Sequence, residues 1–156
     1  LRGLLECELM EDEKVKDMGL MEIILKAVNP LCEAVNNQFV QGIEGMIPRA
    51  FNEKWEGLMT DSCLTGNAQF VILLFRLSHV VKDNLLYLKT ANIILSSLKK
   101  TQIINTDLKD IKGALPGSFP VYRGYLSDAY PNWGTKFFAD ALLMKIGYEQ
   151  QLVISA

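Results

Sequence analysis

The sequence predicts an all-α fold in which antiparallel helical hairpins pack around one core. Apolar residues recur at spacings of three and four along several long segments, which is typical of helices. The alternation of apolar and polar residues that marks a strand is not sustained over a useful length. The chain has 156 residues, of which 49% are hydrophobic and 22% are charged. This composition supplies a core of ordinary domain size and excludes a disordered chain.

The first long helix is predicted over residues 13–39, where Leu25 and Leu31 are among the apolar positions. Proline has no N–H to donate, and its ring disfavours the helical conformation of the residue before it. We therefore expect Asn29 and Pro30 to kink or split this helix.

Two further helices form a predicted hairpin. Residues 62–81 are apolar almost all round, which is the pattern of a helix buried on most sides. After a break at residues 82–84, the apolar residues between Tyr87 and Leu98 occupy one face only, as in an outer helix. Because the connection is so short, the two helices should pack antiparallel.

The last helix is predicted to begin at residues 131–133, with Asn132 as its N-cap, and to end at Gly147. Two segments punctuated by Gly and Pro, residues 41–61 and 102–131, precede the buried helix and this last helix. Compact domains seldom keep irregular connections this long unless they bind something or close a cavity. We expect the two segments to meet at one mouth of the fold; the alternative is that they only cover helix ends.

Charge and residue content argue against several classes of protein. The 16 Lys and Arg residues are balanced by 18 Asp and Glu residues, so we expect no nucleic-acid partner. The longest apolar run, residues 70–75, is far shorter than the ~20 residues of a membrane-spanning helix. The three cysteines are widely spaced and there is one histidine, so we expect no disulfide framework, metal or other cofactor. A cytoplasmic protein is expected.

The two irregular segments are rich in aromatic side chains interleaved with polar ones. Sugar rings stack their C–H faces on aromatic planes, while their hydroxyls need carboxylate, amide and guanidinium partners. The composition therefore predicts a site for a glycan or a sugar-containing small molecule. The alternative is that each aromatic side chain only fastens a Gly-rich loop to the helices. The aromatic residues are Trp55, Tyr122, Tyr125, Tyr130 and Trp133, and the polar residues are Arg49, Asn52, Asp61, Arg123, Asp128 and Asn132.

Three stretches of sequence resemble a known group of proteins. Residues 63–69, CLTGNAQ, resemble part of one hairpin of the six-hairpin (α/α) toroids. Residues 113–120, GALPGSFP, and 130–142, YPNWGTKFFADAL, look like the last loop and inner helix of prenyltransferase/squalene-oxidase-repeat-like proteins of bacterial polysaccharide gene clusters. The resemblance spans most of the chain. It implies a toroid of helical hairpins with a role in polysaccharide or cell-surface glycan metabolism.

The resemblance also implies that residues 1–156 form a single, partial toroid domain. The sequence offers fewer helices than a complete six-hairpin ring needs, and a partial ring leaves an apolar face open. We therefore expect the chain to be the C-terminal half of a longer protein, or to cover the open face with a second copy of itself.

The residues present favour some kinds of catalytic chemistry over others. Terpene cyclases of the toroid type resemble this fold but use clustered aspartates, and no two aspartates are adjacent here. A glycosidase needs two facing carboxyl groups, for which Asp61 and Asp140 are the candidates. A lyase or epimerase would use Tyr125 or Tyr130 as its base, with an anion clamp for a uronate carboxylate. The clamp candidates are Arg49, Arg123 and Lys136.

The candidate catalytic residues are therefore Asp61, Tyr125 and Asp140. Simpler roles stay open, since Asp61 suits a helix cap and Lys136 with Asp140 suits an ion pair within one helix. Two functions remain: a carbohydrate-active enzyme, or a non-catalytic toroid that binds a glycan or lipid-linked sugar or scaffolds biosynthetic partners. The candidate substrate-binding residues are Arg49, Asn52, Trp55, Asn67, Gln69, Tyr122, Arg123, Tyr130, Asn132, Trp133 and Lys136.

Overall fold

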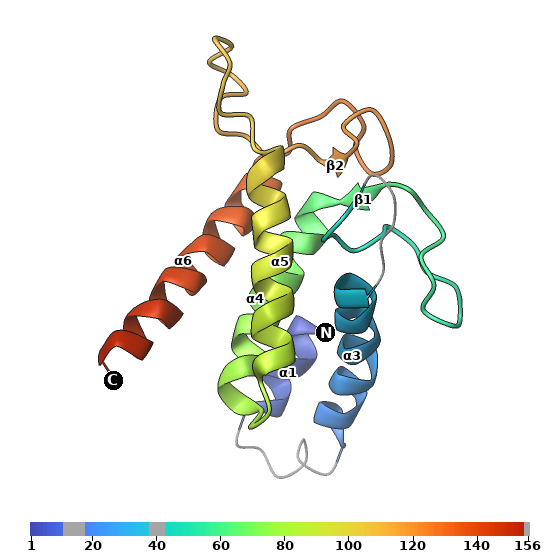
Figure 1. Ribbon diagram of the computed structural model, residues 1–156, viewed down its shortest axis with the longest axis vertical. Coiled ribbons are helices and arrows are strands. Elements are labelled where there is room, and N and C mark those ends of the chain that lie inside the picture. The colour runs from blue at the N-terminus through green and yellow to red at the C-terminus, as the bar shows by residue number, and fades with distance from the viewer. Residues whose placement is uncertain (11–17, 38–42, 155–156) are drawn as a thin grey trace.

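The computed structural model describes residues 1–10, 18–37 and 43–154, and the fold is mostly helical (Figure 1). This confirms the all-α class. A small antiparallel ladder joins two short strands, with Ser62 opposite Phe119. The helices are α1 (Arg2–Glu8), α3 (Leu20–Asn37), α4 (Leu64–Val80), α5 (Leu85–Thr101) and α6 (Asn132–Ile154), and the strands are β1 (Ser62–Cys63) and β2 (Ser118–Phe119).

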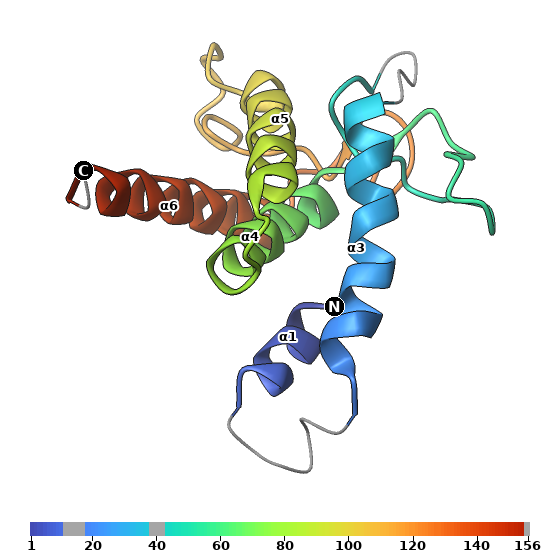
Figure 2. The same ribbon diagram turned by 60° about the horizontal axis from the view of Figure 1, so that its bottom comes forward.

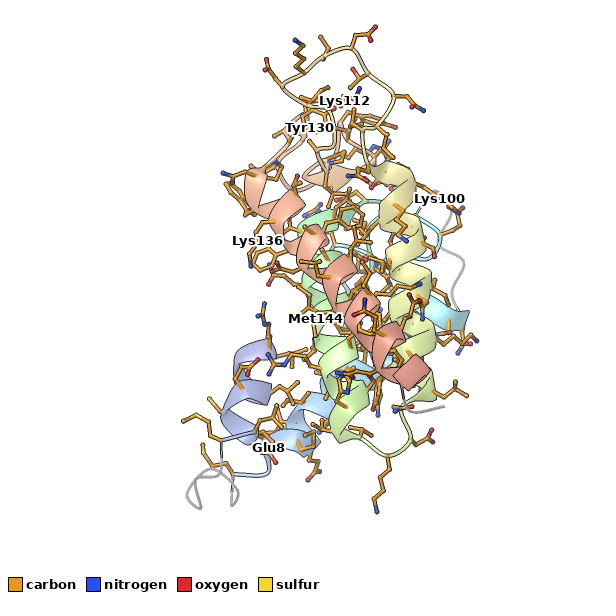
Figure 3. All side chains as sticks on the ribbon, turned by 90° about the vertical axis from the view of Figure 1, so that its left-hand side faces the viewer. Glu8, Lys100, Lys112, Tyr130, Lys136 and Met144 are labelled. Carbon is orange, nitrogen blue, oxygen red and sulfur yellow. The ribbon has the colours of Figure 1, made fainter. Side chains whose placement is uncertain are left out.

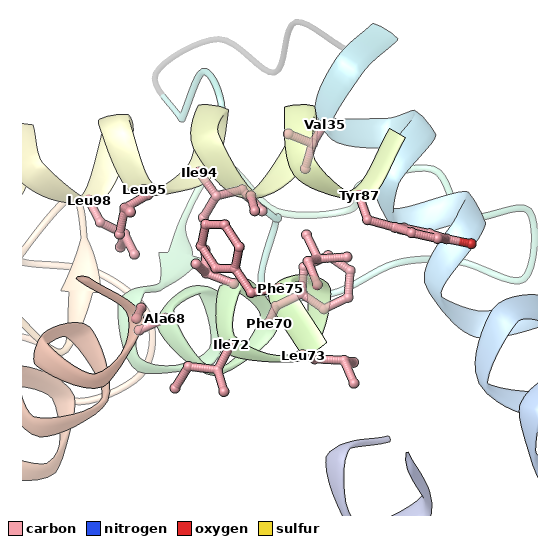
Figure 4. Packing of buried hydrophobic residues seen from close by; sticks show 14 of the residues in the cluster. Val35, Ala68, Phe70, Ile72, Leu73, Phe75, Tyr87, Ile94, Leu95 and Leu98 are labelled. Carbon is pink, nitrogen blue, oxygen red and sulfur yellow. The ribbon is translucent and has the colours of Figure 1, made fainter. Parts of the chain in front are cut away.

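Helix α4 is the centre of the fold and packs against both α5 and α6 (Figure 1). Most of its residues are buried, as its apolar composition on all sides predicts. The short connection turns the chain back so that α5 lies antiparallel to α4, which confirms the predicted hairpin. Their facing side chains form the core, where Phe75 of α4 and Ile94 of α5 are almost fully buried (Figure 4).

Helix α3 packs against α1 and α5. Two hydrogen bonds fix it to α5: Tyr87 Oη donates to Asn29 Oδ1 at 2.9 Å, and Asn36 Nδ2 donates to Thr90 Oγ1 at 2.6 Å. Of the two outcomes expected at Pro30, a kink or a split, the split is wrong, because α3 continues through this proline. Packing on both sides of Pro30 offsets the one helical hydrogen bond that proline cannot make. Residues 13–17 and 38–39 of the predicted helix lie outside the described residues.

The start of the buried helix differs from the prediction. The buried helix begins at Leu64 instead of Ser62, because Ser62 and Cys63 form β1. Cys63 is the N-cap, and its Sγ accepts a hydrogen bond from the Gly66 N–H at 3.4 Å. The suggestion that Asp61 caps this helix is therefore wrong.

The last helix also differs from the expectation. Asn132 is its first helical residue and not its N-cap, and Gly147 does not end it. The carbonyl of Pro131 accepts from the N–H groups of Gly134 and Thr135, so proline occupies the capping position. One glycine inside a helix costs only about 1 kcal/mol, which the packing of α6 on α4 offsets.

The helices flank α4 on different sides (Figure 2). Helix α6 extends away from the α4–α5 pair in one direction, whereas α3 and α1 lie on the other side. The irregular segments lie at the end of the fold where α4 begins (Figure 1). Within the described residues, no helix combines the length and apolarity needed to cross a membrane.

Candidate functional site

A pocket of about 340 Å³ lies between the segment at residues 47–55, α3 and the first turns of α4. Three of the predicted binding residues line it: Arg49, Trp55 and Asn67. Most of the remaining wall is apolar and comes from all three parts of the fold. The other lining residues are Leu31, Ile47, Pro48, Phe51, Cys63, Gly66 and Phe70.

The loop that carries Trp55 is held by a dense set of hydrogen bonds. Asn52 Oδ1 accepts from the backbone N–H groups of Lys54 and Glu56, each at 2.9 Å, and Asn52 Nδ2 donates to Glu56 Oε2 at 2.7 Å. A β-bridge between Phe51 and Gly57 closes the base of the loop. Asn52, a predicted binding residue, therefore uses its side chain to shape the loop.

Trp55 occupies an unusual backbone conformation at the tip of this loop. Its φ is +62°, in the left-handed region that large side chains rarely adopt, which costs on the order of 1–3 kcal/mol. Its side chain lies beside Phe51, with ring centroids 6.0 Å apart, and the residue is 37% exposed. The fold thus holds a partly exposed indole at the pocket at some cost in stability.

Arg49 and Asp61 form an ion pair beside the pocket. Arg49 Nε lies 2.5 Å from Asp61 Oδ2, and Nη2 lies 3.3 Å from Oδ1. The hydrogen bond from Arg49 to the Asp61 carboxylate raises the pKa of the guanidinium above its ordinary value. Asp61 is only 5% exposed, and its backbone carbonyl also accepts from the Arg49 N–H. Its carboxylate is thus occupied in joining two parts of the first irregular segment.

Asn67 is buried on α4 and its side chain is fully engaged. Its Oδ1 accepts from the Ile47 N–H at 2.9 Å, and its Nδ2 donates to Ser62 Oγ and to the Cys63 carbonyl, each at 2.8 Å. These bonds fix the pocket wall to the start of α4. Gln69, two residues further along the helix, is exposed and does not line the pocket.

The second irregular segment meets the first but contributes none of the residues that line this pocket. Arg123 Nη1 donates to Thr60 Oγ1 at 3.2 Å, and the backbone of Gly124 packs on Asp61. Tyr122 and Tyr125 are 62% and 44% exposed, and the Arg123 guanidinium lies 5.6 Å from the Tyr122 ring centroid. The expectation that aromatic residues of both segments share a single hollow is therefore not met at this pocket.

The remaining predicted residues lie on or next to α6. Tyr130 is half-buried just before the helix, and Asn132 and Trp133 are exposed in its first turn. Lys136 Nζ lies 2.5 Å from Asp140 Oδ2, so these two residues form the ion pair considered as their simpler role. Figure 3 shows Lys136 on the side of α6 away from α5.

The three candidate catalytic residues are thus placed in different settings. Asp61 is paired with Arg49, Asp140 is paired with Lys136, and Tyr125 is exposed on the second segment. Each carboxylate has its own cation. Among the described residues, no group of three or more His, Cys, Asp or Glu side chains is arranged to hold a metal ion.

Seven residues that line the pocket were not among the predicted binding residues: Leu31, Ile47, Pro48, Phe51, Cys63, Gly66 and Phe70. Leu31 and Phe70 match helical apolar periodicity, and this signal is the same for a core residue and for a pocket wall. Phe51 carried a usable signal, because it lies four residues before Trp55 within the same aromatic segment.

No protein-family model matches the chain, and searches of curated proteins and of solved structures found no match.

Proposed function

We propose that this chain is a carbohydrate-binding part of a bacterial (α/α)-toroid protein and that it holds a sugar-containing small molecule against Trp55. Its setting would be polysaccharide or cell-surface glycan metabolism in the cytoplasm. The observation that carries the binding proposal is the indole of Trp55, which a hydrogen-bonded loop keeps partly exposed at a pocket. A strained and exposed aromatic side chain is a feature that folding alone does not require.

The side chains around Trp55 suit this class of ligand. An indole offers a flat apolar face for the C–H groups of a sugar ring. Next to it, the Arg49 side chain is 39% exposed, although its Nε and Nη2 are bonded to Asp61. Because Asp61 balances its charge, we expect a neutral sugar to bind at least as well as a uronate.

Three features support the toroid proposal. The α4–α5 pair is an antiparallel hairpin of the kind from which such rings are built. Helix α6 packs on α4 as a neighbouring hairpin would. The residues that resemble the family are 63–69, 113–120 and 130–142. They lie at the start of α4, in the loop before α6 and in the first half of α6. In this proposal, further hairpins of a longer protein or a second copy cover the outer face of α6.

The geometry favours binding over catalysis by these residues. General acid–base catalysis needs carboxyl or hydroxyl groups that converge on one bond of the substrate. Asp61 and Asp140 are each held by a cation, in two different parts of the fold.

The cytoplasmic setting is supported by the three cysteines, all of which are free thiols.

The fluorescence of Trp55 tests the proposal. The sequence contains two tryptophans, so Trp133→Phe leaves Trp55 as the only indole. We expect methyl glycosides of neutral sugars to change its emission in a saturable way. The matched control, Trp55→Phe, retains Trp133 and should show no change. If no sugar in a panel of neutral and uronate glycosides alters Trp55 emission, the proposal is wrong.

Thiol protection gives a second and independent measurement. Cys63 lines the pocket, whereas Cys7 is exposed on α1 and serves as an internal control. Bound ligand should slow the alkylation of Cys63 and leave the alkylation of Cys7 unchanged. Equal slowing at both sites would point to a general effect of the sugar solution.

A further inference from the structure

We infer that the ligand is an amphiphile, with a neutral sugar head and an apolar chain that bind in two adjoining pockets at Trp55. This inference rests on the proposed function and names the class of ligand. A second pocket of about 360 Å³ is lined by α3 and by the loop that carries Trp55. Trp55 is the residue shared by the linings of the two pockets.

The first pocket suits an apolar chain better than a sugar. Six of its ten lining residues are aliphatic or aromatic, and its main polar side chains are already occupied. Asn67 uses both its oxygen and its nitrogen within the fold, and Arg49 binds Asp61. Hydroxyl groups that entered here would lose their water without gaining enough partners, whereas methylene groups would gain from leaving water.

The second pocket has the opposite character. Its α3 wall is formed by residues 30, 33, 34 and 37, which share one helical face. This wall and the facing loop bring Glu33, Asn37 and Lys54 to one space, and all three are exposed. Within the described part of the chain, no salt bridge joins Glu33 to Lys54.

These three side chains suit a neutral head that carries several hydroxyl groups. Glu33 accepts hydrogen bonds, Lys54 donates them, and the Asn37 amide does both. A sugar hydroxyl also donates and accepts, so it can satisfy all three. A purely anionic or purely cationic head would be attracted by one of Glu33 and Lys54 and repelled by the other, so a net charge brings no advantage here. Trp55 then lies at the junction between head and chain.

A series of alkyl β-glucosides tests this inference. Binding of methyl, butyl, hexyl and octyl glucoside to the Trp133→Phe protein would be followed by Trp55 emission, below the concentration at which octyl glucoside forms micelles. Burial of a methylene group is worth about 0.8 kcal/mol, so affinity should rise up to about fourfold per added methylene until the pocket is full. Octanol should bind more weakly than octyl glucoside, because it lacks the head.

Substitutions in the two pockets should have different effects on the binding of the alkyl glucosides. Glu33→Gln and Lys54→Gln should weaken every glucoside by a similar factor and leave the dependence on chain length intact. Leu31→Ser should flatten the dependence on chain length and leave methyl glucoside almost unchanged. Lys89→Gln, at an exposed position on α5 that lines neither pocket, is the matched surface control and should change neither property.

The outcomes distinguish this inference from the proposed function. Equal affinity for methyl and octyl glucoside would overturn the amphiphile while leaving sugar binding at Trp55 intact. Octanol that binds as tightly as octyl glucoside would overturn the assignment of the head pocket. If no glucoside and no other sugar binds, both proposals fail.

Discussion

At the scale of single residues, the loop keeps the indole of Trp55 exposed at a cost in stability. A φ of +62° brings a side chain close to its own backbone, and glycine is the residue that avoids this cost. The Asn52 side chain holds Lys54 and Glu56 in place, so the loop maintains this conformation at Trp55. A loop selected for stability alone would not need a tryptophan here.

Substitutions at Trp55 measure this strain. Both Trp55→Ala and Trp55→Gly remove the indole, but only glycine adopts a positive φ freely. We expect the glycine variant to be about 1 kcal/mol more stable than the alanine variant, the reverse of the usual order of these two residues. Urea denaturation followed by circular dichroism measures the difference. An alanine variant as stable as the glycine variant would show that the conformation is not strained.

Gly124 is the second residue whose conformation the fold requires. Its φ is +74°, and a Cβ at this position would overlap the buried Asp61 carboxylate. Gly113 has a similar φ of +84° but nothing within 4 Å of such a Cβ, so it is a matched control. We expect Gly113→Ala to cost about 1 kcal/mol and Gly124→Ala about 2–3 kcal/mol, because only the second adds a clash. Equal losses on thermal unfolding would mean that Asp61 moves aside freely.

At the scale of elements, the N-terminal end of α4 organises both irregular segments. Strand β1 pairs with β2 just before the helix, and the Leu64 N–H donates to the Gly117 carbonyl at 3.2 Å. Asn67 joins the helix to the Ile47 backbone at the same end. The pocket wall is therefore attached to the most buried helix of the fold.

Asn67 and Gln69 provide a direct test of this role. Asn67→Ala leaves the part-buried Ile47 N–H without its acceptor and the buried Ser62 hydroxyl with one partner fewer, so we expect a loss of about 2–3 kcal/mol of stability. Gln69→Ala removes an exposed amide and should change stability by less than about 0.5 kcal/mol. Chemical denaturation compares the two variants. If Asn67→Ala is as stable as Gln69→Ala, the hydrogen bonds at this end of α4 do not hold the loop.

At the scale of the whole molecule, α6 is covered on one side only. It packs on α4, yet Leu143 is 66% exposed and Ile146 is 49% exposed on this helix. Side chains of this kind on an apolar helix are typical of a surface that a neighbouring element or subunit covers. This arrangement supports the proposal that α6 has a further partner.

Analytical ultracentrifugation tests whether that partner is a second copy. We expect the wild-type chain to self-associate and Leu143→Lys to be monomeric with an unchanged melting temperature, because an exposed side chain contributes little to the core. Leu85→Lys is the matched control, since Leu85 is 72% exposed at the start of α5. A wild-type chain that stays monomeric at high concentration would exclude the second copy and leave further hairpins as the proposed cover.

The helices themselves could be predicted because their signals are local. The spacing of apolar residues in 64–80 and 85–101 is a property of each segment, and the short turn between them leaves only an antiparallel arrangement. Of the kink or split expected at Pro30, the split was wrong, because packing on α1 and α5 holds α3 together across the missing hydrogen bond. The residues near Pro30 in the sequence do not indicate which helices pack against this part of α3.

The sequence by itself determined the helical class, the central hairpin and the aromatic, Gly-rich character of the two irregular segments. Only the tertiary structure decided that Asp61 pairs with Arg49, that Asn67 holds a backbone, and that Trp55, but not Trp133, belongs to the pocket beside Arg49. The physical reason is the separation along the sequence between the residues that interact. Helical periodicity depends on residues three or four positions apart, whereas the partners of a loop side chain depend on where distant segments of the chain come to lie.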